Sequence, residues 1–123
     1  MKRVLVVDDN LDILNLVQII LANNGFEVLT SPKGGDVLMN TESFAPQVIL
    51  LDVFLSGFDG RDICKSLKEN EKTRNIPVIM FSAHCKTDDI IDCKADDFIA
   101  KPFDVNELVS KLKFRVENQH CNN

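Results

Sequence analysis

Two short apolar runs of this sequence end in carboxylates, and these are the residues best suited to chemistry. Residues 48–51 are four consecutive apolar residues that stop at Asp52, and the Val-rich residues 3–7 stop at Asp8 and Asp9. Burying a carboxylate is costly unless it is paired or bound to a cation. Asp52 alone can also be explained as a helix cap or as a residue that orders the loop around Gly57 and Gly60.

Strands and helices alternate along the chain, and this alternation decides where the carboxylates meet. Apolar runs and turn residues predict strands at 3–7, 26–30, 48–51, 78–81 and 97–100, and helices after residue 10 and at about 36–42, 61–70, 87–93 and 104–116. This pattern is typical of an α/β fold with a doubly wound, five-stranded parallel sheet and five helices. The expected flavodoxin-like strand order, 2-1-3-4-5, places Asp8, Asp9 and Asp52 in one crevice.

Three carboxylates in one crevice repel one another, by roughly 1–4 kcal/mol per pair. Either one of them stays protonated, or a divalent cation occupies the crevice; an all-oxygen site with room for water suits Mg²⁺, with Mn²⁺ as a substitute. The fourth and fifth strands end at Ser82 and Lys101, a hydroxyl and an ammonium. With the cation, these groups can hold a phosphoryl group, and the pattern therefore predicts an aspartyl phosphate.

The same positions carry a family resemblance. From about Lys2 to Val116 the chain resembles the response-regulator receiver domains (CheY-like) of two-component signalling. The matching segments are Val7–Asn10, Leu51–Asp52, Phe58–Gly60, Phe81–Ala83 and Ala95–Phe103. Any one of these segments is a weak signal, whereas their occurrence in this order is specific.

The resemblance implies roles for the acidic residues. Asp52 would accept phosphate from a histidine kinase or a histidine phosphotransfer protein. Asp9, Asp52 and the backbone carbonyl of Phe54 would bind Mg²⁺ directly, and Asp8 would act mostly through metal-bound water.

The resemblance also implies roles for residues around the phosphoryl group. Lys101 and Ser82 would each contact a phosphoryl oxygen, and the Lys101–Pro102 peptide would be cis. Phe98 would turn inward when Ser82 moves. The surface formed by the fourth helix, fifth strand and fifth helix would then control a downstream effector protein, docking on Ile99, Lys101 and the exposed side of 104–114.

Several positions depart from the family's pattern. Ser56 stands where the loop often has proline, which predicts a looser loop. Lys94 replaces the usual glycine, so a left-handed helix-ending residue is expected to be missing. The segment from Ser82 to Lys101 is about three residues short, close to one helical turn. We therefore expect a short fourth helix, with residues 83–94 becoming ordered on phosphorylation, and we expect Phe54 and His84 to flank the path of the hydrolytic water.

The composition narrows the class of protein. With 123 residues and 45% hydrophobic residues, the chain is large enough for one domain with its own core. A net charge of −5 argues against direct binding to nucleic acid or to an anionic membrane. No apolar run approaches 18 residues, and the four cysteines form no Cys-x-x-Cys pair. Reduced thiols in a cytoplasmic protein are the expectation.

We therefore expect a receiver domain at 1–117 and a disordered tail at 118–123, with no effector domain in this chain. It would be a monomer or weak dimer and a phosphoacceptor switch rather than an enzyme. Two alternatives remain open from the residues: a Mg²⁺-dependent phosphoesterase that uses the same acidic crevice, and a degenerate receiver that acts as a constitutive docking module. Turnover of a phosphate ester would identify the first, and failure to bind Mg²⁺ the second.

Overall fold

Five parallel strands form the centre of the molecule. The computed structural model describes residues 2–83 and 87–118, without the side chains of Thr87 and Asp89. The strands are β1 (Lys2–Val7), β2 (Phe26–Ser31), β3 (Val48–Asp52), β6 (Val78–Ser82) and β7 (Asp97–Ala100), and the sheet has the order β2-β1-β3-β6-β7. The predicted order of a flavodoxin-like sheet is thus confirmed.

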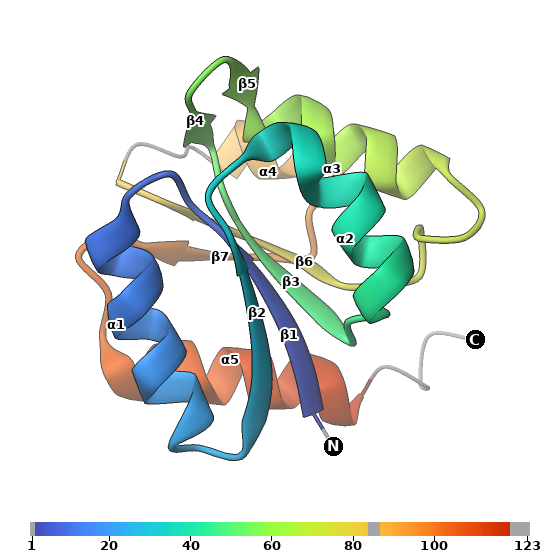
Figure 1. Cartoon of the computed structure of the whole chain (residues 1–123). Coiled ribbons are helices and arrows are strands. Elements are labelled where there is room, and N and C mark those ends of the chain that lie inside the picture. Colours follow the sequence, from blue (N-terminus) through green and yellow to red (C-terminus); the bar gives the residue numbers. More distant parts are fainter. Residues whose placement is uncertain (1, 84–86, 119–123) are drawn as a thin grey trace.

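Helices cover both faces of this sheet (Figure 1). α1 (Leu11–Ala22) and α5 (Val105–Glu117) lie on one face, and α2 (Val37–Phe44), α3 (Gly60–Glu69) and α4 (Thr87–Cys93) lie on the other. A 3₁₀ turn, η1 (Gly34–Asp36), precedes α2 and was not expected from the sequence. Side-chain caps begin three of the helices: Asn10 caps α1, Asp59 caps α3 and Asp104 caps α5.

The two central strands explain why the sequence has continuous apolar runs. All five residues of β3 and all five of β6 are buried, because helices cover both faces of the sheet. Alternate side chains enter two separate cores, one beneath α1 and α5 and the other beneath α2, α3 and α4. Asp52 and Ser82 therefore sit at the ends of two strands whose residues are all buried.

A small hairpin follows β3, and the sequence did not predict it. β4 (Phe54–Leu55) and β5 (Phe58–Asp59) pair antiparallel around a turn at Ser56 and Gly57, where Gly57 has a φ of 76°. Glycine adopts this left-handed conformation without the cost of a Cβ clash. Gly60 ends the hairpin, and a Cβ there would lie 2.0 Å from the carbonyl oxygen of Asp52.

The fourth helix is short, as predicted, but its end differs from the prediction. α4 has seven residues, and Lys94 directly after it has a φ of 63°. The expectation that a left-handed residue would be missing is therefore wrong. A lysine adopts the conformation at a cost of roughly 1–2 kcal/mol, and the amide of Ala95 still donates to the carbonyl of Ile90 at 3.1 Å.

Two apolar residues do not lie where the sequence suggested. Ile99, expected on the docking surface, is fully buried against α5, because the side chains of a strand alternate between faces and Phe98 takes the other side. Leu38 on α2, whose apolar side chain favours a buried position, is instead 43% exposed. The predicted tail at 118–123 lies outside the described residues except for Asn118, whose side-chain amide donates to the carbonyl of Phe114.

Candidate phosphoacceptor site

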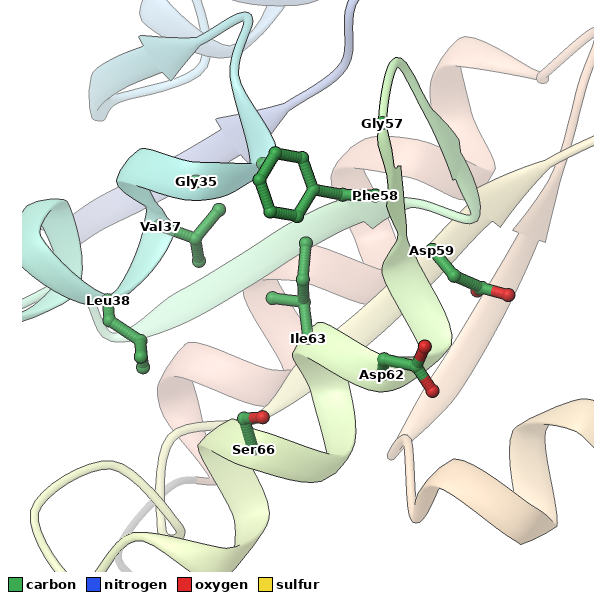
Figure 2. A pocket seen from close by; sticks show the side chains of 10 residues that line it. Gly35, Val37, Leu38, Gly57, Phe58, Asp59, Asp62, Ile63 and Ser66 are labelled. Atoms are coloured by element: carbon green, nitrogen blue, oxygen red, sulfur yellow. The ribbon is translucent and has the colours of Figure 1, made fainter.

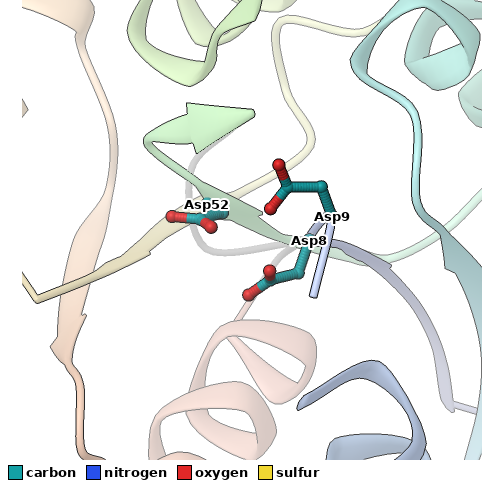
Figure 3. A group of neighbouring side chains, drawn as sticks. All are labelled: Asp8, Asp9 and Asp52. Atoms are coloured by element: carbon teal, nitrogen blue, oxygen red, sulfur yellow. The ribbon is translucent and has the colours of Figure 1, made fainter. Parts of the chain in front are cut away.

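The three predicted carboxylates meet at one edge of the sheet. Asp8 and Asp9 follow β1, Asp52 ends β3, and these strands are neighbours in parallel register. Each side chain offers an oxygen within 4.8 Å of the others, and Figure 3 shows the three side chains gathered at this edge. The prediction that they share one crevice is therefore confirmed.

The carboxylates differ in burial. Asp8 is fully buried and Asp52 is 6% exposed, whereas Asp9 is exposed. Burial is the main cause that raises the pKa of Asp52 above its ordinary value, and the nearby Asp8 carboxylate adds to it. The Lys101 ammonium opposes both effects. A cation bound in the crevice would act in the same direction as Lys101 and favour the ionised form of Asp52.

Lys101 supplies a first positive charge. Its Nζ donates to Oδ2 of Asp8 at 2.5 Å and to Oδ2 of Asp52 at 3.3 Å. The ammonium also lies 4.6 Å from the centre of the Phe81 ring. The peptide between Lys101 and Pro102 is cis, as predicted. The lysine reaches the crevice from β7, across β6, and its side chain is 17% exposed.

Ser82 and Phe98 occupy the neighbouring strands β6 and β7, where Phe98 is in register with Met80, two residues before Ser82. Ser82 is the buried last residue of β6 and pairs in register with Ala100 on β7. Phe98 is half-buried on β7 and packs against the core beneath α2, α3 and α4. The strand ends place Ser82 beside the crevice, and the predicted coupled movement of the two residues stays a prediction.

Phe54 lies in the hairpin directly after Asp52. Its amide donates to Oδ1 of Asp52 at 3.3 Å, and its ring is 53% exposed with the guanidinium of Arg61 at 5.9 Å. The backbone of Phe54 therefore borders the crevice, while its side chain is exposed and lies beside Arg61. His84, the other residue expected near the hydrolytic path, lies outside the described residues.

Ser56 makes a contact with Asp9 that the sequence did not predict. Its amide and its hydroxyl both donate to Oδ2 of Asp9, at 3.0 and 2.9 Å. The expected looser loop is therefore tied to the crevice by two hydrogen bonds. The contact cannot be predicted from hydrophobic periodicity or residue spacing in the sequence, because it depends on the path of the hairpin.

A separate cavity of about 340 Å³ lies behind the hairpin, between η1, α2 and α3. Figure 2 shows the Phe58 ring between Gly35, Val37 and Ile63. A Cβ at Gly34 would lie 2.9 Å from the Cβ of Phe58, so this glycine makes room for the hairpin. None of the three carboxylates lines the cavity, which is therefore distinct from the acidic crevice.

The donor set of the crevice fits a magnesium ion. Carboxylate and carbonyl oxygens with space for water are the ligands that Mg²⁺ prefers, and thiol or imidazole ligands are not among the three grouped side chains. With one ammonium against three carboxylates, a divalent cation would bring the local charge close to neutral.

Among the described residues, no helix is long and apolar enough to cross a membrane.

Comparisons with known proteins agree with this geometry. Residues 4–113 match the family model of the response regulator receiver domain. A receiver domain protein (CheY-like) from Methanospirillum hungatei superposes with a TM-score of 0.91 at 25% identity, covering 100% of this chain and 99% of that one. A putative response regulator from Chloroflexus aurantiacus gives a TM-score of 0.87 at 28% identity, covering 94% and 98%.

Longer regulators are similar over part of their length. The DNA-binding response regulator MtrA of Mycolicibacterium paratuberculosis is 32% identical over 118 residues, which are 94% of this chain and 51% of that protein. The chain thus spans about half the length of the curated relatives it matches.

Fold, crevice and family match lead to the same conclusion. The acidic crevice is consistent with the phosphoacceptor site of a receiver domain. The chain belongs to the response-regulator receiver domain family of two-component signalling.

Proposed function

We propose that Asp52 accepts a phosphoryl group from a histidine kinase or a histidine phosphotransfer protein, and that the phosphorylated domain controls a downstream protein. The observation that carries this proposal is the placement of the buried Asp52 carboxylate between Asp9 and the Lys101 ammonium. The side chain of Asp52 keeps 9% of its surface exposed at the end of β3, and the Lys101 ammonium beside it would stabilise added negative charge.

Asp9, Asp52 and the backbone carbonyl of Phe54 would hold Mg²⁺, and Asp8 would hold a metal-bound water. The ion would neutralise charge on the phosphoryl oxygens during transfer. Asp8 fits the indirect role because Lys101 and the amide of Asn10 already donate to its two oxygens.

In the transfer, a carboxylate oxygen of Asp52 forms a bond to phosphorus while the bond from phosphorus to the donor's imidazole nitrogen breaks. The imidazole leaves with the bonding electron pair. Lys101 lies within reach of Asp52 and would move its hydrogen bond from Asp8 to a phosphoryl oxygen. Ser82 would donate its hydroxyl to another oxygen, and Phe98 would follow that movement inward.

The donor would dock beside Lys101. An apolar groove of about 380 Å³ runs between α1 and the residues after β7, lined by Ile13, Leu16, Ile20, Lys101, Pro102, Phe103 and Val105. A helix of the kinase or phosphotransfer protein that packs there would bring its phosphohistidine close to the Asp52 crevice. Lys101 joins the two sites, since it lines the groove and contacts Asp52.

The output surface would comprise α4, the exposed edge of β7 and α5. Phe114, 56% exposed on α5, offers an apolar contact for an effector protein, whereas the buried Ile99 does not. We place the domain in the cytoplasm as a monomer or weak dimer, with residues 1–117 as the functional unit. The acidic net charge of −5 disfavours direct binding to nucleic acid.

The test is phosphorylation by acetyl phosphate, followed by intact-mass measurement with Mg²⁺ and with chelator. We expect one phosphoryl group per chain with Mg²⁺ and none with chelator. Hydrolysis of a generic phosphate ester in many turnovers would instead support a phosphoesterase. Mg²⁺-independent labelling would contradict the proposed role of the ion.

A further inference from the structure

Each carboxylate of the crevice accepts a hydrogen bond from one backbone amide. The amide of Asn10 donates to Asp8 at 2.9 Å and that of Phe54 to Asp52 at 3.3 Å, each from two residues further along the chain. Asp9 has a different donor, because the amide that reaches it belongs to Ser56, 47 residues away. The geometry of Asp9 therefore depends on the hairpin, whereas that of Asp8 and Asp52 depends on local turns.

The surroundings of Asp9 also differ from those of the other two carboxylates. It is exposed, while Asp8 and Asp52 are buried and share the Lys101 ammonium. Both hydrogen bonds from Ser56 reach the same oxygen, Oδ2, at 3.0 and 2.9 Å. They fix the carboxylate with Oδ2 towards the hairpin, and Oδ1 is left as the oxygen with which Asp9 can bind a cation.

We propose that Ser56 is a positioning residue for the magnesium site, which orients Asp9 before the ion arrives. This inference rests on the proposed function, because it assumes that the crevice binds Mg²⁺. Groups that hydrogen-bond to a metal-ligating carboxylate fix its direction, and their loss typically lowers metal affinity 10–100-fold. Proline, which has no amide hydrogen and no hydroxyl, could make neither bond at this position.

A series of variants at position 56 distinguishes the orientation of Asp9 by Ser56 from a general effect of Ser56 on the stability of the hairpin. Ser56→Thr keeps both donors, Ser56→Ala keeps only the amide, and Ser56→Pro keeps neither. Ser110→Ala on the exposed side of α5 is the matched control. Mg²⁺ affinity is measured by isothermal titration calorimetry, since the chain has no tryptophan or tyrosine to report binding by fluorescence.

We expect Ser56→Ala to weaken Mg²⁺ binding about tenfold, at the lower end of that range, and Ser56→Pro to weaken it further. Ser56→Thr and Ser110→Ala should bind as the wild type does. Urea denaturation without Mg²⁺ shows which variants fold. If Ser56→Pro does not fold, the comparison of Mg²⁺ affinity between Ser56→Ala and Ser56→Thr tests the inference. Equal Mg²⁺ affinity in the wild type and Ser56→Ala would overturn the inference and leave the proposed function standing.

A second measurement tests the contact without any metal. Asp9→Ala removes the acceptor, so amide hydrogen exchange at Ser56, followed by NMR in chelator, should become faster than in the wild type. Unchanged exchange would show that the two residues are not joined in solution and would overturn the inference. Failure of the wild type itself to bind Mg²⁺ would remove the proposed function and the inference together.

Discussion

The Nζ of Lys101 lies closer to Asp8 than to the phosphoacceptor, at 2.5 Å from Oδ2 of Asp8 against 3.3 Å from Oδ2 of Asp52. In the resting domain the ammonium is therefore held mainly by the one fully buried carboxylate of the crevice. A phosphoryl group on Asp52 would offer this ammonium a second, stronger acceptor.

Removing the ammonium should destabilise the domain. Lys101→Met leaves Asp8 and Asp52 without their cation, and breaking a buried ion pair in this way costs about 3–5 kcal/mol. We expect a loss of that order in urea denaturation without Mg²⁺, and a smaller loss when Mg²⁺ is present. Lys33→Met, at an exposed lysine, is the control and should change stability by less than about 0.5 kcal/mol. A loss for Lys101→Met no larger than the control's would contradict the burial of this pair.

Asp59 should make stability depend on pH. Hydrogen bonds from Arg61 are the main cause that lowers the pKa of Asp59, and its side chain also caps α3. A carboxyl group whose pKa is lowered by folding stabilises the protein above its unfolded pKa and loses that effect as the pH falls through its folded pKa. We expect about 1 kcal/mol from cap and ion pair together at neutral pH, because the side chain is 34% exposed and the charges are screened.

Two variants distinguish the cap from the charge. Asp59→Asn keeps a capping oxygen and should lose only the charge contribution, whereas Asp59→Ala should lose both. The difference between wild type and Asp59→Asn should shrink as the pH is lowered through the region below 3.8, the ordinary value for Asp. A difference that stays constant down to pH 2 would show that the ion pair contributes nothing.

Gly60 should be intolerant of a side chain. A Cβ there would lie 2.0 Å from the Asp52 carbonyl oxygen and 3.0 Å from the Cα of Val53, and both are backbone atoms with no rotamer to change. We expect Gly60→Ala to lower stability by about 2–4 kcal/mol and to slow phosphorylation by displacing Asp52. Gly25→Ala is a useful comparison, because it meets no atom within 4 Å and its φ of 87° is the source of its cost. Unaltered phosphorylation of a folded Gly60→Ala variant would refute this account of the turn.

Phosphorylation should order α4. The helix has only seven residues, and Ile91 on it is 67% exposed, so few apolar contacts hold it to the sheet. We expect beryllofluoride, which mimics the phosphoryl group, to slow amide hydrogen exchange across Thr87–Cys93 through new contacts at Ser82 and Lys101. Equal exchange with and without beryllofluoride would show that the signal leaves the domain by another route.

The fold and the acidic crevice could be predicted because they follow from local patterns. Continuous apolar runs identify strands covered on both faces, and parallel strands bring their carboxyl ends to one edge, which places Asp8 and Asp52 together without knowledge of the loops. Lys101 follows by the same logic from the end of β7.

The remaining features depend on long-range packing. Ile99 is buried because α5 covers that side of β7, which the strand's own sequence does not reveal. Lys94 adopts a left-handed conformation although the sequence, with lysine in place of glycine, predicted that no residue here would do so. The hydrogen bonds between Ser56 and Asp9 connect two residues that are 47 positions apart in the sequence. They form because the hairpin brings Ser56 to the crevice, and hydrophobic periodicity carries no information about the path of a hairpin.

The most direct test of the central claim is to locate the phosphoryl group. After treatment with acetyl phosphate and Mg²⁺, borohydride reduction converts an aspartyl phosphate into homoserine, and peptide mass spectrometry identifies the position. We predict homoserine at position 52 in the wild type and none in Asp52→Asn. Homoserine at position 8 or 9, or labelling that survives in Asp52→Asn, would contradict the assignment of Asp52 as the phosphoacceptor.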